Sequence, residues 1–476
     1  MSVPFDTIPS GIRRPGIYSE FNLAMAGVGL PPRNDKIVLL AQRTSDGSKA
    51  ALETYKVFSA AEVAAGSGSG SIAHFAATAM YEANPYIDVT VIGIDDASSG
   101  VAATGTITIG GPATGNGIAA INVGNETVSV SYENEDTATD VATKLKDMLN
   151  IKVLPVTATS AEGVITLTAR NKGTCGNYIR LGAETTGNGI TAAVTSAMAS
   201  GDGDPDYSAE DGVLDALFAG DFTVYVSALT DKTNLQALRD HLDQISNGVE
   251  MRPAVGVFGY TDLVGDMASV ETLCGEDLNA WRMSCAYLPN SKSSPWEIAG
   301  AYAAVLVSED HPNAVWNDLV LAGINAPDVS GRLSAMMQEE LLNNGVTPLR
   351  VVPGEQVAIV RAITTHITNS QGIPDAVRLD LSKPRALDYV RSACRNRVSL
   401  KFVRIRKTEE NRQLLIDEIL DVLYLLEAEE VVRDTEHWKD YLTVEDDTVD
   451  DTRWNVKCPA AIVPGLHVLA IRIDLL

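Results

Sequence analysis

Cysteine is scarce in this chain and follows no recognisable spacing. Of 476 residues five are cysteine, an odd number without a CxxC pair: Cys175, Cys274, Cys285, Cys394 and Cys458. A disulfide-based fold uses an even and dense set of cysteines, and a structural zinc site uses closely spaced ligands. Neither is indicated, so we predict reduced thiols and no metal site.

Motifs of common enzymes are absent as well. There is no GxSxG and no HExxH, and the six histidines lie far apart in the sequence. His437, between Glu436 and Asp440, is the best acid or base candidate, although a solvated histidine on an acidic stretch is the simpler interpretation. Distant residues could still converge in the fold. We nevertheless predict no catalytic residues, no cofactor and a protein that is not an enzyme.

Positive charge is in deficit. Lys and Arg number 37 against 62 Asp and Glu, a formal net charge of −25. A chain with this excess of negative charge is not expected to bind nucleic acid in a sequence-independent way or to bind an anionic membrane surface. No basic-then-apolar signal segment precedes the body, and no apolar run is long enough to cross a bilayer. We therefore expect a protein made and kept in the cytoplasm, with no membrane insertion and no direct nucleic-acid partner.

Apolar runs and helical patterns alternate along most of the chain. Lys36 to Gln42 reads KIVLLAQ, a continuous apolar run typical of a strand covered on both faces. Helical spacing follows over residues 59–82, a strand over 86–94, and the alternation resumes from Phe222 to Leu288. This predicts an α/β core, a mixed and partly parallel sheet covered by helices, built from residues 31–94 and 204–458. Two further strands are predicted over 349–352 and 356–368, around Pro353-Gly354.

A Gly-Ser run, Gly66 to Gly70, precedes one of the predicted helices. Free N–H groups there could cradle a phosphate. The run lacks the Walker lysine and is not a GxGxxG motif, so a flexible helix-entry loop is the preferred interpretation.

Composition changes between Asp95 and Gly203. Gly, Thr, Ala and Val dominate, short alternating runs are separated by turn signals, and one amphipathic helix is expected over 136–150. This pattern predicts that residues 95–203 form an inserted β-rich outer domain. The Asp-Gly run at 201–206 lacks the spacing and closing Glu of an EF-hand, which favours a solvated linker over a calcium site.

Strand-like arms flank the body. In residues 466–476 Leu469, Ile471 and Ile473 alternate with small or polar residues, behind Pro459 and Pro464-Gly465. A matching pattern includes Ile17 and Phe21 near the N-terminus. Each segment would either pair as an edge strand of its own subunit or offer its backbone to another molecule. We predict an N-terminal arm over residues 1–30 and a C-terminal arm strand over 459–476.

A switch of charge precedes the C-terminal arm. Seven basic residues between Arg391 and Lys407 are followed by an acidic helix predicted from about Thr408 to Val432. Leu415, Ile419, Val422 and Leu426 share one face of that helix, and Glu410, Asp417 and Asp421 are predicted to face away from it. The acidic face is either an ordinary solvated surface or a contact surface.

Four segments carry a resemblance to a known family: FDTIPSGIRRPGIYSEFN, GSGSGSIAHFAATAMYEANPYIDVTVIGIDD, SPWEIAGAYAAVL and VRAITTHITNSQGIPDAVRLDLSKPRALDYVRSACR. By their order and spacing they resemble the contractile tail sheath proteins of Mu-like bacteriophages, over nearly the whole chain outside residues 95–203. The resemblance implies a virion subunit, assembled in the host bacterial cytoplasm, that polymerises as rings or a helix around a tail tube. Contraction would drive the tube through the bacterial envelope.

The same resemblance implies partners and site residues. Further copies of the chain, the tail tube protein, and baseplate and tail terminator proteins are the expected partners. In such sheaths extended arms pair with strands of neighbouring subunits and a helix near the C-terminus faces the tube. These roles would belong to the two arms and to the acidic helix with Glu410, Asp417 and Asp421. Alternatives are another self-assembling surface or capsid-like protein, or an α/β enzyme with a nonlocal site.

Overall fold

The chain divides into two compact units. The computed structural model describes residues 13–16, 29–33, 35–262, 267–402 and 404–475. Unit 1 comprises Met1–Pro32 and Tyr389–Val463, and unit 2 comprises Arg33–Asp388 and Pro464–Leu476. The boundary at 388/389 lies inside the part predicted as one piece over 204–458. It lies there because the second half of α9 (Ser382–Lys401) pairs with α10 (Glu409–Ala428).

An eight-stranded mixed sheet forms the centre of unit 2, in the order β15-β14-β13-β12-β11-β1-β3-β2. The inner strands run parallel, while β2 and β15 at the two edges are antiparallel to their neighbours. This confirms the predicted mixed, partly parallel sheet. The strands are β1 (Ile37–Gln42), β2 (Thr54–Val57), β3 (Val89–Ile94), β11 (Val224–Ser227), β12 (Val255–Tyr260), β13 (Met283–Tyr287), β14 (Thr347–Val352) and β15 (Gln356–Ile359).

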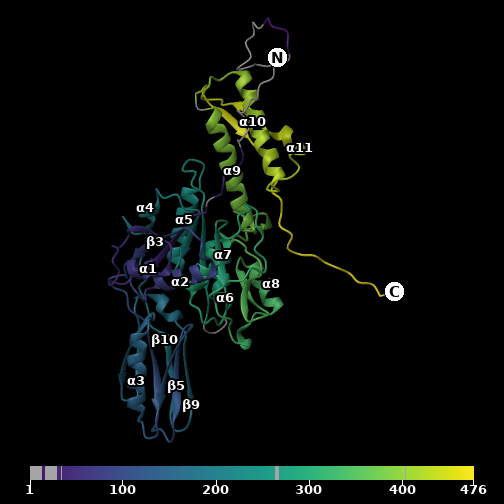
Figure 1. Cartoon of the computed structure of the whole chain (residues 1–476). Coiled ribbons are helices and arrows are strands. Elements are labelled where there is room, and N and C mark those ends of the chain that lie inside the picture. Colours follow the sequence, from purple (N-terminus) through teal and green to yellow (C-terminus); the bar gives the residue numbers. More distant parts are fainter. Residues whose placement is uncertain (1–12, 17–28, 34, 263–266, 403, 476) are drawn as a thin grey trace. The chain divides into compact units, whose positions relative to one another are not determined.

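Helices lie around the central sheet of unit 2 (Figure 1). They are α1 (Ala60–Ser67), α2 (Ile72–Ala83), α4 (Val213–Leu217), α5 (Lys232–Ile245), α6 (Met267–Glu271), α7 (Pro295–Leu306) and α8 (Ala335–Asn343). Every residue of α7 except the half-buried Glu297 is buried, and α7 packs on α2 and on β12. A Cβ at Gly300 would lie 2.5 Å from the carbonyl oxygen of Ala76, so glycine is what lets α2 and α7 approach so closely.

Two predicted elements differ from the observed ones. The strand predicted over 356–368 ends at Ile359, because its partner β14 begins at Thr347 and Ile359 already pairs with Leu349. Within the alternation predicted from Phe222 to Leu288, the sequence pattern indicates one helix over 262–279; the structure has α6 followed by a π-helical segment, Thr272–Leu278, which ends where Asn279 adopts a left-handed conformation. Residues 263–266 lie outside the described part of the chain.

Residues 104–199 form two additional sheets and one helix. The sheets have the orders β10-β4-β8-β7 and β6-β5-β9, and their strands pair antiparallel. Their elements are β4 (Thr104–Gly110), β5 (Gly117–Val123), β6 (Glu126–Tyr132), α3 (Ala138–Ile151), β7 (Val156–Ala161), β8 (Val164–Ala169), β9 (Leu181–Thr186) and β10 (Thr191–Ala199). That this region serves as an inserted outer domain stays a prediction.

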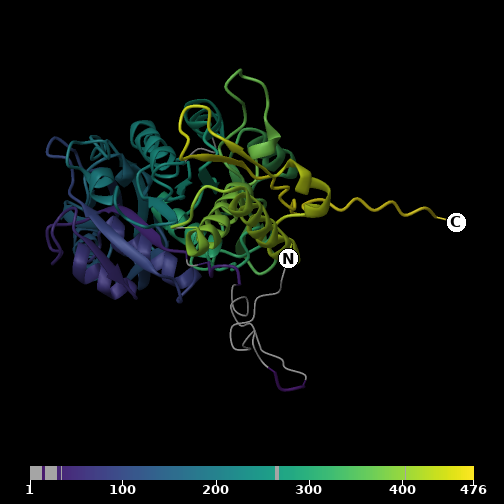
Figure 2. The same cartoon turned by 90° about the horizontal axis from the view of Figure 1, so that it is seen from above.

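Unit 1 is built around the pair of α9 and α10, which lie side by side in both views (Figures 1 and 2). Four of the seven residues of the basic block lie on α9, a helix that the charge pattern did not predict, and the other three follow it. Thr408 caps α10 by accepting from the Asn411 N–H. The predicted apolar face of Leu415, Ile419, Val422 and Leu426 is buried as expected. α11 (Thr435–Trp438) and the hairpin of β16 (Thr443–Asp446) and β17 (Trp454–Lys457) follow.

Candidate functional site

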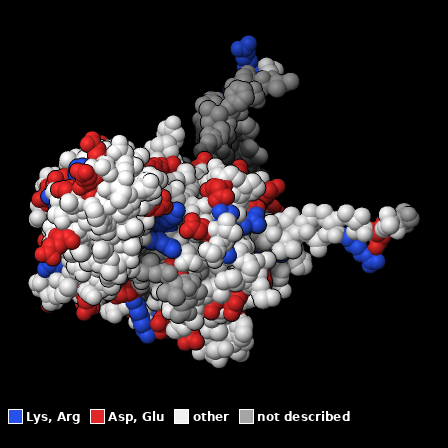
Figure 3. Space-filling view, turned by 90° about the horizontal axis from the view of Figure 1, so that it is seen from below, with Lys and Arg blue, Asp and Glu red and all other residues white. Residues whose placement is uncertain are grey.

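The C-terminal segment after Pro464 is extended and unpaired. Leu469 and Ile471 are each 74% exposed and Ile473 is 90% exposed. Within the described chain, no backbone hydrogen bond reaches residues 468–475 and no strand is formed there. Side-chain charge occurs only at Arg472 and Asp474, so most of the segment is an uncharged surface (Figure 3). The first alternative, an edge strand within the same subunit, is therefore not the arrangement of this structure.

His467 anchors the start of this segment to unit 2. Its Nδ1 lies 3.1 Å from the side-chain nitrogen of Asn317, and its Nε2 lies 3.5 Å from Asp380 Oδ1. Asp380 also receives hydrogen bonds from the guanidinium of Arg361, at 2.9 and 2.7 Å. Burial lowers the pKa of His467. The lowered pKa favours the neutral imidazole at neutral pH, and every described residue after His467 is exposed.

The N-terminal candidates Ile17 and Phe21 lie outside the described residues. Their predicted role as an inter-subunit arm stays a prediction.

The three acidic candidates of α10 do not share one environment. Glu410 and Asp417 are exposed, and Asp417 accepts from the Gln413 side chain at 3.0 Å. Asp421 is half-buried and forms an ion pair with Arg397 of α9 at 2.7 Å. The prediction that Asp421 lies on an unpaired face of α10 is therefore wrong in part, because the neighbouring helix α9 places a cation on that side.

Glu418 is the residue of this helix that sequence reasoning missed. Its side chain is 8% exposed and pairs with Arg397 at 3.2 Å and with Lys401. Burial pushes the pKa of Glu418 upward, but the hydrogen bonds from Lys401 and Arg397 outweigh it and hold that pKa below its ordinary value. Glu418 lies three residues after Leu415 and four residues before Val422, so it falls within the apolar stripe of the helix. This spacing is the signal in the sequence that could have indicated a buried carboxylate.

The sheet edge where open α/β proteins bind ligands is filled by the chain itself. Strand order reverses at β1 and β11, and a ligand crevice is expected beyond the carboxyl ends of such strands. There Gln42 Nε2 donates to Asp96 at 2.7 Å and to the Lys172 carbonyl at 2.8 Å. Asn171 donates to the Arg43 carbonyl at 2.8 Å. The side chains of Gln42 and Asn171 are thus held by hydrogen bonds to groups of their own chain.

The Gly-Ser run is packed against its own chain as well. Ser67 Oγ lies 2.6 Å from the hydroxyl of Tyr55, and the same ring closes the space beside Gly66. The Gly66 carbonyl accepts from the Lys49 N–H. Gly66 and Ser67 end helix α1 and four of the five residues of the run are buried, so the run is a packed turn between α1 and α2 and not the flexible loop that was expected.

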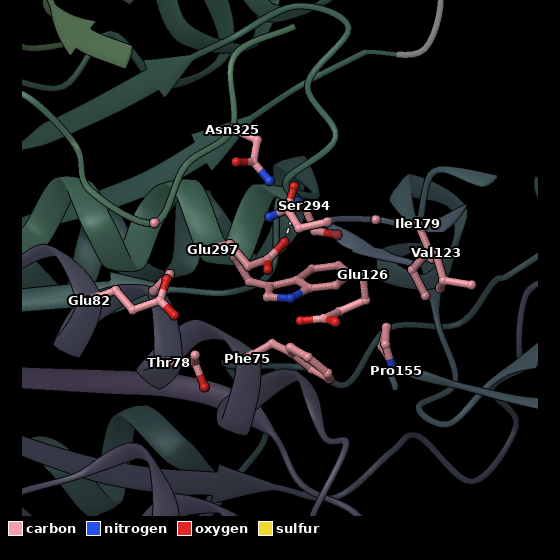
Figure 4. Close-up of a pocket in the computed structure, with 15 residues that line it drawn as sticks. Phe75, Thr78, Glu82, Val123, Glu126, Pro155, Ile179, Ser294, Glu297 and Asn325 are labelled. Carbon is pink, nitrogen blue, oxygen red and sulfur yellow. Dashed lines mark hydrogen bonds between the residues drawn. The ribbon is translucent and has the colours of Figure 1, made fainter. Parts of the chain in front are cut away.

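A cavity of about 270 Å³ lies between α2, α7 and the turn joining β5 to β6 (Figure 4). Glu297 accepts from the Ser294 N–H at 2.6 Å and thereby caps α7. Burial, with smaller contributions from the charges of Glu82 and Glu126, raises the pKa of Glu297 to about 7. The polar lining of the cavity consists of carboxylates, hydroxyls and amides, without cysteine or histidine.

Other chemical candidates are weak in the part of the chain that the structure describes. His437 is exposed and stacks edge-on against Trp438, with ring centroids 4.8 Å apart. Among the described residues no group of three His, Cys, Asp or Glu side chains is placed to hold a metal ion. None of the described helices is long and apolar enough to cross a membrane.

Comparison with known proteins gives one consistent result. Residues 375–475 match the family model of the phage tail sheath C-terminal domain. Over 489 aligned residues, 99% of each chain, the protein is 28% identical to the Mu-like prophage FluMu tail sheath protein of Haemophilus influenzae. The chain is thus similar over its whole length to a Mu-like tail sheath protein, and its C-terminal part matches the sheath family.

Solved structures agree with this similarity at the level of the fold. The chain is similar to the helical sheath of the anti-feeding prophage in its contracted state, with a TM-score of 0.52 and 11% identity, over 97% of this chain and 98% of that one. The contracted PVC sheath complex of an extracellular contractile injection system gives the same TM-score and identity, over 98% of each chain. The family match includes α9, α10 and the exposed C-terminal segment. A family of structural sheath subunits also implies a non-enzymatic role.

Proposed function

We propose that this protein is the structural subunit of a bacteriophage contractile tail sheath, a component of the virion. It polymerises around a tail tube and contracts to drive the tube through the host envelope. The single observation that carries this proposal is the exposed, unpaired C-terminal segment within the region that matches the sheath family.

The C-terminal segment acts as a donated strand. Its backbone N–H and C=O groups have no partner among residues 468–475, and Leu469, Ile471 and Ile473 project from one side of an extended chain. Strand addition of this kind uses backbone hydrogen bonds for affinity and alternate side chains for register. A neighbouring copy of the chain is the partner, and Ile17 and Phe21 contribute the second arm.

α10 faces the tube through Glu410 and Asp417. Both carboxylates are exposed and point away from the buried stripe, so a basic tube surface could meet them without altering the fold. Asp421 contributes less, because Arg397 already neutralises it. The baseplate and tail terminator proteins are further partners of the subunit, and assembly takes place in the host cytoplasm. The extended sheath is a metastable state that stores the energy of contraction.

Residues 95–203 form an outer domain. In its strand β10 eight of the nine residues are exposed or half-exposed, so this sheet presents a face to solvent. An epitope inserted at Asn188, in a turn between two glycines with positive φ, should remain accessible to antibody in assembled tubes. A buried epitope in intact tubes would contradict the outer position.

Electron microscopy of the purified full chain tests the main proposal. We expect tubes or rings in negative stain, and folded monodisperse particles when the chain is cut after Pro464. A matched control carries Arg472→Ala, which leaves the apolar side chains in place. Monodisperse full-length protein at all concentrations would overturn the proposal, and tubes formed by the truncated chain would overturn the role of the arm.

A further inference from the structure

One side chain holds the root of the C-terminal segment to unit 2. The side chain of His467 is 15% exposed, whereas Leu466 and Val468 on either side of it are 76% and 78% exposed. Of the described residues after Pro464, Gly465 and His467 are half-buried and all the others are exposed. The attachment of this segment is therefore concentrated on the imidazole ring and on the glycine just before it.

The contacts of the ring are those of a neutral imidazole. Nδ1 of His467 lies 3.1 Å from the side-chain nitrogen of Asn317 and 3.3 Å from its oxygen, so the neutral ring accepts a hydrogen bond from the amide. Nε2 is buried and has no hydrogen-bond partner among the described residues, although Asp380 Oδ1 lies 3.5 Å away. A Cβ at Gly465 would lie 3.1 Å from Nε2 and 2.6 Å from the Val315 side chain, so the chain runs close to both.

Three charged groups face the ring, and two of them are cations. Arg361 donates two hydrogen bonds to Asp380 Oδ1, at 2.9 and 2.7 Å. Lys383 lies 3.9 Å from the other oxygen of Asp380. The single carboxylate beside His467 is thus already shared by two cations. A proton on the imidazole would add a third positive charge in a partly buried place.

We propose that His467 is a pH-sensitive latch at the root of the C-terminal segment. The neutral imidazole stays docked between Asn317 and Asp380, and the protonated imidazole leaves this position. The latch is a property of the single subunit. Only its effect on linked subunits rests on the proposed function.

The direction of the switch follows from the two states of the ring. Burial, and next the charge of Arg361, lower the pKa of the docked His467 below 6.5, against the opposing effect of Asp380. A released ring in water has the ordinary pKa, so the released state binds the proton more tightly. Docking is therefore favoured fully above pH 6.5 and is weakened as the pH falls from there through the docked pKa.

Release lengthens the free part of the chain. While the ring is docked, residues 468–475 extend beyond it. Undocking adds residues 465–467, which reach about 10 Å further at about 3.3 Å per residue. In the donated-strand arrangement proposed above, acidification would thus give linked subunits more room to move.

Nuclear magnetic resonance of the full chain tests the latch. Histidine is labelled with ¹³C at Cε1 in the Ile471→Asp chain, which is expected to stay monomeric, and spectra are recorded between about pH 5 and 8. The His467 signal is identified by its loss in His467→Gln. We expect a midpoint below 6.5 and a line that is broad at high pH and narrow in acid, because a released ring moves independently of the body. Where the chain assembles, deuterium exchange at Cε1, followed by mass spectrometry, gives the same midpoint.

Three variants separate a latch from a merely structural contact. Asn317→Asp places a carboxylate against Nδ1, which should raise the pKa of His467 and keep the ring docked in acid. Lys383→Met removes a repelling cation and should weaken the acid release. Gly465→Ala should release the ring at every pH, because its Cβ would meet Val315.

Each possible result decides one part of the proposal. A midpoint of His467 at or above 6.5, or a line that stays broad in acid, overturns the latch. Acid release in Asn317→Asp equal to that of the parent chain overturns the role of charge. A latch that behaves as expected in a protein whose full chain forms no tubes counts against the proposed function alone.

Discussion

β1 and the C-terminal segment are similar as sequences and opposite as structures. Both are short apolar runs in extended backbone. In β1 all six residues are buried and the strand pairs with β3 on one side and β11 on the other. In residues 468–475 the apolar side chains are exposed and the backbone is unpaired within the described chain.

The difference teaches what a local pattern can specify. Alternation and β-branched residues favour an extended chain and define its sides. Which strand lies alongside depends on distant residues: β1 has β3 and β11 on either edge, and the C-terminal segment has none among the residues that the structure describes. A segment that keeps its pattern without a partner in its own fold is suited to find one on another molecule.

The largest effect is expected from placing the same substitution in the two runs. Leu39→Asp puts an unpaired carboxylate in the middle of the sheet, where Leu39 is fully buried, and should prevent folding into soluble protein. Ile471→Asp should leave the melting temperature within about one degree of wild type, since exposed positions contribute little, and should abolish tube formation. Circular dichroism, thermal melting and microscopy of both variants measure this, and an unfolded Ile471→Asp chain would show that the segment stabilises its own subunit.

A smaller effect, on how the stability of the subunit changes with pH, is expected when the carboxylate of Glu297 is compared with an exposed one. The pKa of Glu297 is raised to about 7 from 4.5, so the folded chain binds this proton more tightly than the unfolded chain does. Stability from this group is then fully present below pH 4.5 and is lost as the pH rises toward 7, by roughly 3 kcal/mol. Glu297→Gln stays uncharged and can still cap α7, so it should unfold like wild type near pH 4.5 and at a higher urea concentration at pH 8.

The exposed Glu410→Gln variant is the control for Glu297→Gln. It should show the wild-type dependence of the urea midpoint on pH. Parallel curves for Glu297→Gln and wild type from pH 4.5 to 8 would mean that Glu297 does not titrate in this range.

The smallest effect per residue is expected on α10. Glu410→Lys with Asp417→Lys should not change stability, but should reduce binding to purified tube protein at low salt, since each exposed ion pair contributes about 0.2–1 kcal/mol and the pairs repeat around the sheath. Asp421→Lys should lower the stability of the subunit by about 1 kcal/mol, because it places a second cation beside Arg397. Co-sedimentation with tubes and urea unfolding separate the two. Equal tube binding by the double variant and wild type at low salt would remove α10 from the contact.

Much of the central sheet follows from local pattern. The run KIVLLAQ is buried on both faces as its continuous apolar character predicts, and the helix starting at Ser294 has its capping box in the sequence. β5, β7 and β9 were not predicted, because short Gly- and Ala-rich strands carry weak alternation. Neither the pairing of Arg397 with Asp421 nor the network around Gln42 is visible locally, since each joins residues from separate elements.

The anchoring of His467 sets how far a neighbouring subunit can be. Only residues 468–475 extend freely beyond the contacts with Asn317 and Asp380. At about 3.3 Å per residue, eight residues reach roughly 26 Å. In the donated-strand arrangement proposed above, a partner strand would have to stay inside that radius through every rearrangement of the assembly, so the length of the tether, and not the strength of any contact, would limit the displacement between linked subunits.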